Sequence, residues 1–326
     1  AFTPFDLSRE VHTELLWAFE GITSYYDDLS LARTGLITPE SYLELLGQTL
    51  TRVYRGRGRF KQTVTESSFD AWTRFYKQDE NAPNAIVSYY AKGSLVALAL
   101  DLTLRERTND ARSLDDLMRL LWQRHGQTGV GVPEQGVQAL AEEIAGCDLG
   151  DFFNQALYRT EDLPLEALLA ERGVTVNWRP ADGHSDNGGK LGKSRAPVHL
   201  GARFASDPQG ARLQVAYEQG AAMEAGLAAG DVVLLNDLAH AEAVLNVDIL
   251  LGLLSEEGDL GGAQVGGVHA GEARGQQADL GEQARRHPLV LTAAHGHGTG
   301  AIARQLAARH TSGTMGQTKV TVLGVE

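Results

Sequence analysis

The spacing of apolar residues divides the chain into a helical first part and a β-rich second part. Up to about residue 172, apolar side chains recur every three or four positions, the period of an amphipathic helix. Beyond about residue 197 they alternate with polar ones, the period of a strand. The pattern predicts an α+β protein with a helical domain over 1–172, a linker over 173–196 that is turn-rich between 182 and 190, and a β-rich domain over 197–326.

Two short motifs place helices in the first part of the chain. Thr38-Pro39-Glu40 supplies an N-cap, a proline at the first helical position and an acid in the first turn, which predicts a helix over 39–54. Ser67 and Asp70 have the spacing of a capping box and predict a short helix that begins after Ser67. Residues 88–105 are apolar on most sides, so we expect this stretch to be the central helix of the domain.

A helix near the N-terminus carries a carboxylate beside its predicted buried face. The apolar residues of that face recur at helical spacing and are Leu15, Phe19, Ile22, Tyr26 and Leu29. Glu20 lies about 100° from Phe19 around the helix axis. Burying a carboxylate there is costly unless a cation meets it. A lysine or arginine in a structural ion pair and a metal ion both answer that need, and the spacing alone leaves the two open.

Composition and charge exclude several classes of function. The 326 residues carry a formal net charge of −13, which argues against nucleic acid as a partner, because phosphate contacts need clustered lysine and arginine. The one basic run, from Arg52 to Lys61, is expected to be a solvated surface segment. The single cysteine, Cys147, rules out an internal disulfide. The chain contains no run of about 18 apolar residues, so the sequence predicts no membrane-spanning helix.

Two stretches resemble the active-site sequences of gluzincin aminopeptidases. Residues 17–29, where Glu20-Gly21 precedes a small residue and aromatics, resemble the helix that supplies the third zinc ligand. Residues 87–93 resemble the Tyr-x-Lys-Gly stretch that carries the transition-state tyrosine. Residues 67–72 and 79–84 resemble the glycyl aminopeptidase family, whose members carry a PDZ domain after the catalytic domain. The resemblance covers about 1–172 well and about 197–236 less fully.

This resemblance implies a fold and an activity. The first part of the chain would be the all-helical C-terminal lobe of a thermolysin-like metallopeptidase, followed by a small PDZ-like domain. The parent enzyme would remove N-terminal residues from a peptide substrate, with glycine and alanine preferred and a zinc-bound water as the nucleophile. Glu20 would be a zinc ligand, and Tyr90, or its neighbour Tyr89, would stabilise the oxyanion.

The chain departs from the family in one respect. Gluzincins take two zinc histidines and the general base from a His-Glu-x-x-His helix, and no such motif occurs between Ala1 and Glu326. His12 lies eight residues, or about 12 Å along a helix, from Glu20, and is expected to be a surface histidine. We therefore expect the chain to begin just after its active-site helix, and to lack zinc and activity on its own. The alternative is a non-catalytic helical scaffold with a PDZ-like peptide-binding module.

The second part of the chain resembles a PDZ domain over about forty residues. Residues 200–204 resemble the carboxylate-binding loop and second strand, and residues 220–236 resemble the helix-turn and the Gly-Asp-strand element. In a PDZ groove, backbone N–H groups of a glycine loop capture the C-terminus of a peptide or protein. The loop residues would be Leu200, Gly201, Ala202 and Arg203. A glycine-rich tract from about residue 258 is expected to be poorly ordered, and residues 319–323 alternate like a late strand.

Overall fold

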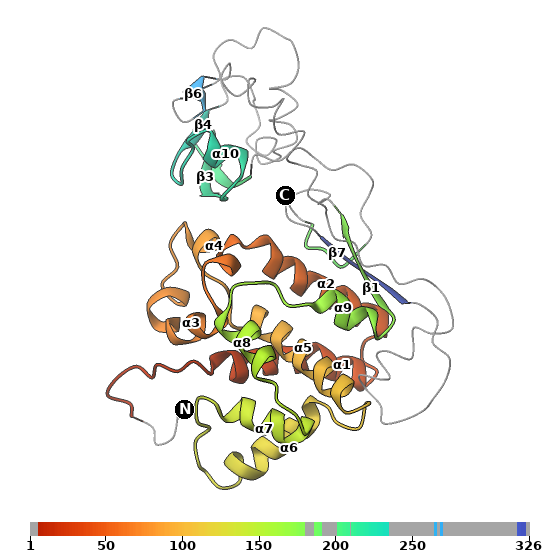
Figure 1. Ribbon diagram of the computed structural model, residues 1–326. Helices are drawn as coiled ribbons and strands as arrows, with labels where there is room; N and C mark the ends of the chain where they lie inside the picture. The colour runs from red at the N-terminus through yellow and green to blue at the C-terminus, as the bar shows by residue number, and fades with distance from the viewer. Residues whose placement is uncertain are drawn as a thin grey trace.

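The structure, a computed structural model, describes residues 6–179, 186–190, 201–208 and 210–234, and the backbone of residues 264–265, 268–269 and 318–323. Figure 1 shows helices α1 to α9 gathered in one lobe, strands β1 and β7 along one side of it, and a β-rich module next to α4. The helices are η1 (Trp17–Gly21), α1 (Ile22–Arg33), α2 (Pro39–Arg55), η2 (Arg57–Phe60), α3 (Val64–Phe69), η3 (Ala71–Phe75), α4 (Ala82–Ala85), α5 (Ala91–Arg107), α6 (Leu114–Leu121), η4 (Trp122–Gly126), α7 (Gly136–Ala145), α8 (Gly150–Tyr158) and α9 (Leu165–Ala170). No helix among the described residues is both long and apolar enough to cross a bilayer.

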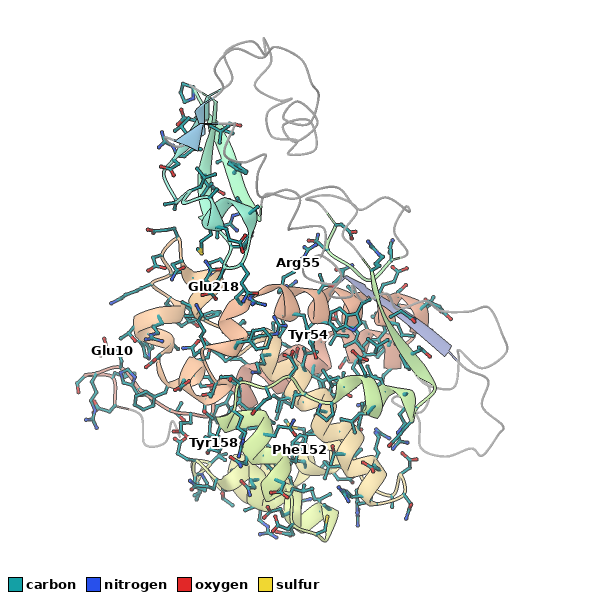
Figure 2. All side chains as sticks on the ribbon, turned by 45° about the horizontal axis from the view of Figure 1, so that its top comes forward. Glu10, Tyr54, Arg55, Phe152, Tyr158 and Glu218 are labelled. Carbon is teal, nitrogen blue, oxygen red and sulfur yellow. The ribbon has the colours of Figure 1, made fainter. Side chains whose placement is uncertain are left out.

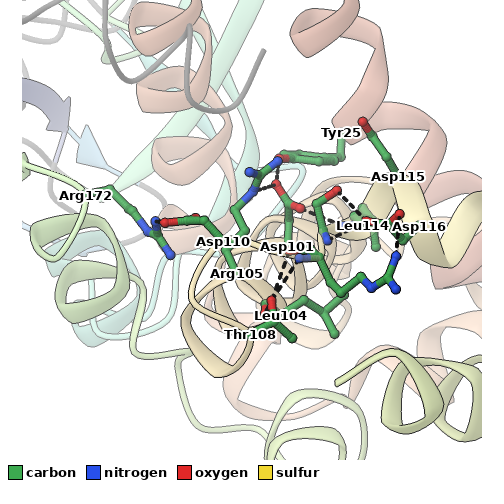
Figure 3. Close-up of polar contacts among 12 residues, drawn as sticks. Tyr25, Asp101, Leu104, Arg105, Thr108, Asp110, Leu114, Asp115, Asp116 and Arg172 are labelled. Atoms are coloured by element: carbon green, nitrogen blue, oxygen red, sulfur yellow. Dashed lines mark hydrogen bonds and ion pairs between the residues drawn. The ribbon is translucent and has the colours of Figure 1, made fainter. Parts of the chain in front are cut away.

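The central helix is α5, as its apolar sequence predicts. Its buried residues run without a break from Ala91 to Leu104. The run includes Asp101, whose carboxylate accepts hydrogen bonds from the Tyr25 hydroxyl at 2.9 Å, the Arg105 Nε at 3.1 Å and the Leu114 amide at 2.7 Å (Figure 3). A buried charge needs such partners; the bond from Arg105 lies within α5, and those from Tyr25 and Leu114 tie α5 to α1 and to the start of α6.

The caps of α2 and α3 differ in how well the sequence predicts them. The Thr38 hydroxyl accepts from the Ser41 amide at 3.1 Å and confirms the predicted start of α2. The capping box of α3, however, is made by Thr63 and Glu66, so the box predicted at Ser67 is wrong. The Ser67 hydroxyl is buried and donates to the carbonyl of Val87 at 2.5 Å, a contact from twenty residues along the chain.

The first helical segment buries a different residue from the one predicted. Phe19 is 37% exposed, whereas Trp17 is 1% exposed and belongs to the core. Both residues lie in η1, a π-helical turn that accommodates an extra residue, so Trp17, five residues before Ile22, shares its buried face in place of Phe19. Ile22 and Leu29, past this turn, are buried as predicted.

The basic run is not solvated throughout. Arg59 is buried, and its Nε pairs with the carboxylate of Asp162 at 3.0 Å. Its guanidinium also lies 3.9 Å from the centre of the Phe60 ring. The expectation of a surface segment is therefore wrong at Arg59. Asp162, from a distant loop, offsets the cost of burying its charge.

A strand occupies the start of the predicted linker. Strand β1 (Val174–Arg179) pairs in parallel with β7 (Thr318–Leu323), so the predicted late strand forms and lies beside the helical lobe. Residues 186–190 also pack on the lobe: Asp186 pairs with Arg179 at 2.5 Å, and a Cβ on Gly189 would lie 2.3 Å from a backbone oxygen of α2. The turn-rich sequence is thus held against the lobe over these residues.

The β-rich module is a small antiparallel sheet with one short helix. Its strand order is β2-β3-β4-β5-β6, and its helix is α10 (Ala221–Glu224). The strands are β2 (Ala202–Asp207), β3 (Gly210–Ala216), β4 (Val232–Leu234), β5 (Gln264–Val265) and β6 (Val268–His269). A small core of its own packs Leu213 against α10 and Leu227. This arrangement is compatible with the predicted α+β class, and the assignment of the module to the PDZ fold stays a prediction. The remainder of the glycine-rich tract lies outside the described residues.

Candidate functional site

Two glycines bring the N-terminal segment of the chain against the start of α5. A Cβ on Gly21 would lie 2.5 Å from the carbonyl carbon of Gly93, and a Cβ on Gly93 would lie 3.0 Å from the Cα of Gly21. The backbones of η1 and α5 therefore touch directly, which glycine alone allows. Glu20 is next to the contact on one chain segment, and Tyr90 is one turn before it on the other.

Glu20 is partly exposed and has no hydrogen bond or ion pair with any other described residue. Its negative charge lies close enough to Tyr90 to raise the pKa of that phenol. The sequence left open whether Glu20 forms a structural ion pair or binds a metal ion. No lysine or arginine within the described part of the chain pairs with it, which disfavours the first alternative. Glu20 is an open carboxylate beside a phenol.

Tyr90 belongs to a cluster of aromatic rings at the start of α5. Its ring centre lies 4.7 Å from that of Tyr89 and 5.9 Å from that of Phe75. The Tyr89 hydroxyl donates to the Tyr76 hydroxyl at 3.0 Å. Tyr89 is 1% exposed and Tyr90 is only partly buried, so the latter is the more accessible of the two predicted tyrosines.

The surroundings of Tyr90 raise the pKa of its phenol. Partial burial raises its pKa to about 12, with further contributions from the Tyr76 hydroxyl and from the charge of Glu20. Burial likewise raises the pKa of Tyr89 well above its ordinary value. At neutral pH the Tyr90 hydroxyl is therefore a neutral hydrogen-bond donor.

Two members of the cluster were not singled out as site residues from the sequence. Phe75 contacts both tyrosines, with its ring centre 4.8 Å from that of Tyr89 and 5.9 Å from that of Tyr90, and Tyr76, 58% exposed, pairs its hydroxyl with that of Tyr89. The available signal was the density of aromatic residues between 69 and 76, directly before the resembling stretch. His12 is exposed, and its Nδ1 lies 2.9 Å from the carbonyl oxygen of Phe69, as expected of a surface histidine.

A zinc site is incomplete in this part of the chain. A catalytic zinc takes three protein ligands and leaves one position open. Among the described residues, no group of three or more histidine, cysteine, aspartate or glutamate side chains could hold a metal ion. Glu20 is one candidate ligand, and the described residues do not fit zinc on their own.

The predicted peptide-binding loop lies in the β-rich module. Leu200 is outside the described residues, Ala202 is buried in β2, and the Arg203 side chain is exposed. Gly201 has a φ of 64°, and a Cβ there would lie 2.5 Å from the Cα of Gly220, so this position requires glycine. Its carbonyl accepts from the Tyr217 amide at 2.8 Å.

Comparisons with known proteins agree with the resemblance. Residues 1–96 match the family model of the M61 glycyl aminopeptidases. The chain is also similar to a crystal structure described as an aminopeptidase N family protein from Idiomarina loihiensis, with 45% sequence identity and a TM-score of 0.68. The match covers 71% of this chain and 40% of that one, so the chain spans less than half the length of this relative. No curated protein matches. Residues 1–96 include Glu20, Tyr89 and Tyr90. Their match to the M61 glycyl aminopeptidase family confirms the family resemblance predicted from the motifs.

Proposed function

We propose that this chain is part of a zinc aminopeptidase and that the region of Glu20 and Tyr90 faces the peptide substrate. The observation that carries the proposal is the direct contact of Gly21 with Gly93, which brings the segment of the open Glu20 carboxylate to that of the Tyr90 phenol, near enough for its charge to raise the pKa of the phenol. The match of residues 1–96 to glycyl aminopeptidases supports the reaction class and a preference for N-terminal glycine or alanine.

Tyr90 is proposed to donate a hydrogen bond to the oxygen of the attacked carbonyl. A phenol with the ordinary tyrosine pKa is already neutral at pH 7, and the raised pKa of Tyr90 extends that state to higher pH, so the hydroxyl is a donor when negative charge develops on that oxygen. Tyr90 is partly exposed, whereas Tyr89 is 1% exposed and its hydroxyl donates to that of Tyr76. Because a substrate can reach the more exposed side chain, Tyr90 is the better candidate of the two.

Glu20 is proposed as one carboxylate ligand of zinc in a protein that supplies the other ligands. No cation within the described residues competes for this carboxylate. One carboxylate cannot replace a three-ligand site, so the chain by itself is proposed to hold no stoichiometric zinc and to be inactive.

A second candidate function is a non-catalytic scaffold whose β-rich module binds a peptide. The lack of a three-ligand group among the described residues favours it, as does the position of β2 at the end of the described sheet, where a peptide strand could add. The predicted loop of Gly201, Ala202 and Arg203 lies at the start of that strand.

Zinc content and arylamidase activity test the proposal on the chain as given and on a chimera. The chimera joins to this chain the part of the Idiomarina protein that it does not cover. We expect neither zinc nor hydrolysis of glycine or alanine arylamides from the chain alone, and both from the chimera. One tightly held zinc per unfused chain, lost in Glu20→Gln, would contradict the proposal that the chain alone holds no stoichiometric zinc.

Variants of the chimera separate the two tyrosines. Tyr90→Phe should lower kcat by roughly 10²- to 10³-fold with little change in KM, because it removes a donor that matters mainly in the transition state. Tyr89→Phe is the matched control and should keep most of kcat. Glu20→Gln should lower zinc content, because an amide is a poorer ligand than a carboxylate. An inactive chimera that binds a peptide at the β-rich module would favour the scaffold.

A further inference from the structure

Asn84 joins the helical lobe to the β-rich module. Its side chain is 2% exposed and fully hydrogen-bonded. The Nδ2 donates to the carbonyl of Ala216 at 2.8 Å, and the Oδ1 accepts from the amide of Glu218 at 2.9 Å. The second Nδ2 hydrogen is donated to the side chain of Asn81 at 3.0 Å. One buried amide thus holds two backbone groups that lie more than 130 residues away.

The same turn of the module also carries an exposed ion pair. The Glu218 carboxylate lies 2.6 Å from the Nζ of Lys61, at the end of the module that faces the helices (Figure 2). Both side chains of this pair are more than a third exposed, so the pair contributes little to the contact. The buried bonds of Asn84 are therefore the stronger tie, since losing them would leave a buried carbonyl and a buried amide unsatisfied.

The segment from Asn84 to Tyr90 is held at successive backbone positions. A Cβ on Gly58 would lie 2.0 Å from the carbonyl oxygen of Ile86, so the backbones of η2 and this segment are in contact. The Val87 amide donates to the Gln62 side chain at 3.0 Å, and the Val87 carbonyl accepts from Ser67 at 2.5 Å. The hydroxyl of Ser88 then accepts from the first amide of α5 at 3.2 Å. The segment is therefore a short, ordered backbone with Asn84 at one end and Tyr89 and Tyr90 at the other.

We propose that Asn84 is a positioning residue for Tyr90. By bonding the backbone of the β-rich module, it holds the segment 84–90, and with it the Tyr90 hydroxyl, in place beside Glu20. The consequence for catalysis rests on the proposed function, whereas the positioning itself does not. The module would then act on the site from outside it, through one buried side chain.

Fluorine NMR of the full chain labelled with 3-fluorotyrosine tests this positioning. The signals of Tyr76, Tyr89 and Tyr90 are assigned with the three Tyr→Phe variants. Asn84→Ala should shift or broaden these signals under conditions where circular dichroism shows a folded chain. Lys61→Ala, which removes the ion pair at the same turn, is the matched control and should leave them at their wild-type positions.

A variant of the same size covers the case in which Asn84→Ala leaves a cavity and does not fold. Asn84→Asp keeps the acceptor for the Glu218 amide but places a carboxylate oxygen opposite the Ala216 carbonyl in place of the donor, so it should also move these signals. Unchanged tyrosine signals in a folded Asn84 variant would overturn the proposal, and so would equal shifts in Lys61→Ala. A Tyr90→Phe chimera with full activity would instead refute the proposed function and leave this result standing.

Discussion

Replacing Gly21 with alanine tests the close backbone contact between η1 and α5. The added Cβ would lie 2.5, 2.6 and 2.9 Å from the carbonyl carbon, Cα and carbonyl oxygen of Gly93. Carbon atoms in favourable contact are about 3.5–4.0 Å apart, so the two segments must separate by roughly 1 Å. All three neighbours are backbone atoms, which cannot rotate away as a side chain can.

The magnitude follows from two opposing effects. Overpacking of this kind costs about 1–3 kcal/mol, and a clash with backbone belongs at the upper end. Alanine in a helix is favoured over glycine by about 1 kcal/mol, which offsets part of that cost. We therefore expect Gly21→Ala to lower the free energy of unfolding by about 2 kcal/mol and Tm by roughly 4–8 °C.

Thermal and urea denaturation, followed by circular dichroism, measure this loss across a graded series. Gly93→Ala should cost less, because its Cβ would lie 3.0 Å from the Gly21 Cα and from the Trp17 carbonyl oxygen. Gly56→Ala is the control, since its Cβ would meet atoms at 3.6 and 3.8 Å, which are ordinary contacts. A Gly21→Ala variant as stable as Gly56→Ala would refute the close contact, and with it the reason why Glu20 lies beside Tyr90.

Three further predictions concern buried and paired charges, each measured by denaturation. Asp101→Ala should cost about 3–5 kcal/mol, because it leaves two buried donors and one partly buried donor without their acceptor; a cost below 1 kcal/mol would contradict this. Lys92→Met should cost nothing at pH 7, since the ammonium is 3% exposed, has no hydrogen-bond partner among the described residues, and has its pKa lowered by burial; a clear loss would refute that reasoning. Burial raises the pKa of Asp115, but hydrogen bonds from Tyr26 and Arg33 outweigh it and lower that pKa below its ordinary value. The stabilisation from Asp115 is therefore present above about pH 4 and is lost as the pH falls further, so the deficit of Asp115→Asn should shrink in acid.

Local signals were enough to place the elements that bear the candidate site. The proline and threonine that open α2 act on neighbouring backbone groups, so their effect is the same in any tertiary context. The apolar run of α5 leaves no polar face to turn to solvent, which made a central position predictable. Motif spacing identified Glu20, Tyr89 and Tyr90 for the same reason, because each motif occupies a few consecutive residues.

Contacts between distant segments decided what those residues meet. Ser67 satisfies the sequence rule for a helix cap. Its hydroxyl instead donates a hydrogen bond to the Val87 carbonyl, and Thr63 caps α3. Trp17 replaces Phe19 in the core because a π-helical turn accommodates an extra residue where Gly21 meets Gly93. The sequence by itself placed α2 and α5 and singled out Glu20, Tyr89 and Tyr90 as candidates for a site. Tertiary structure alone decided that Glu20 finds no cation in the described chain and that Asn84 bonds the β-rich module, since burial and pairing depend on atoms brought in from far along the chain.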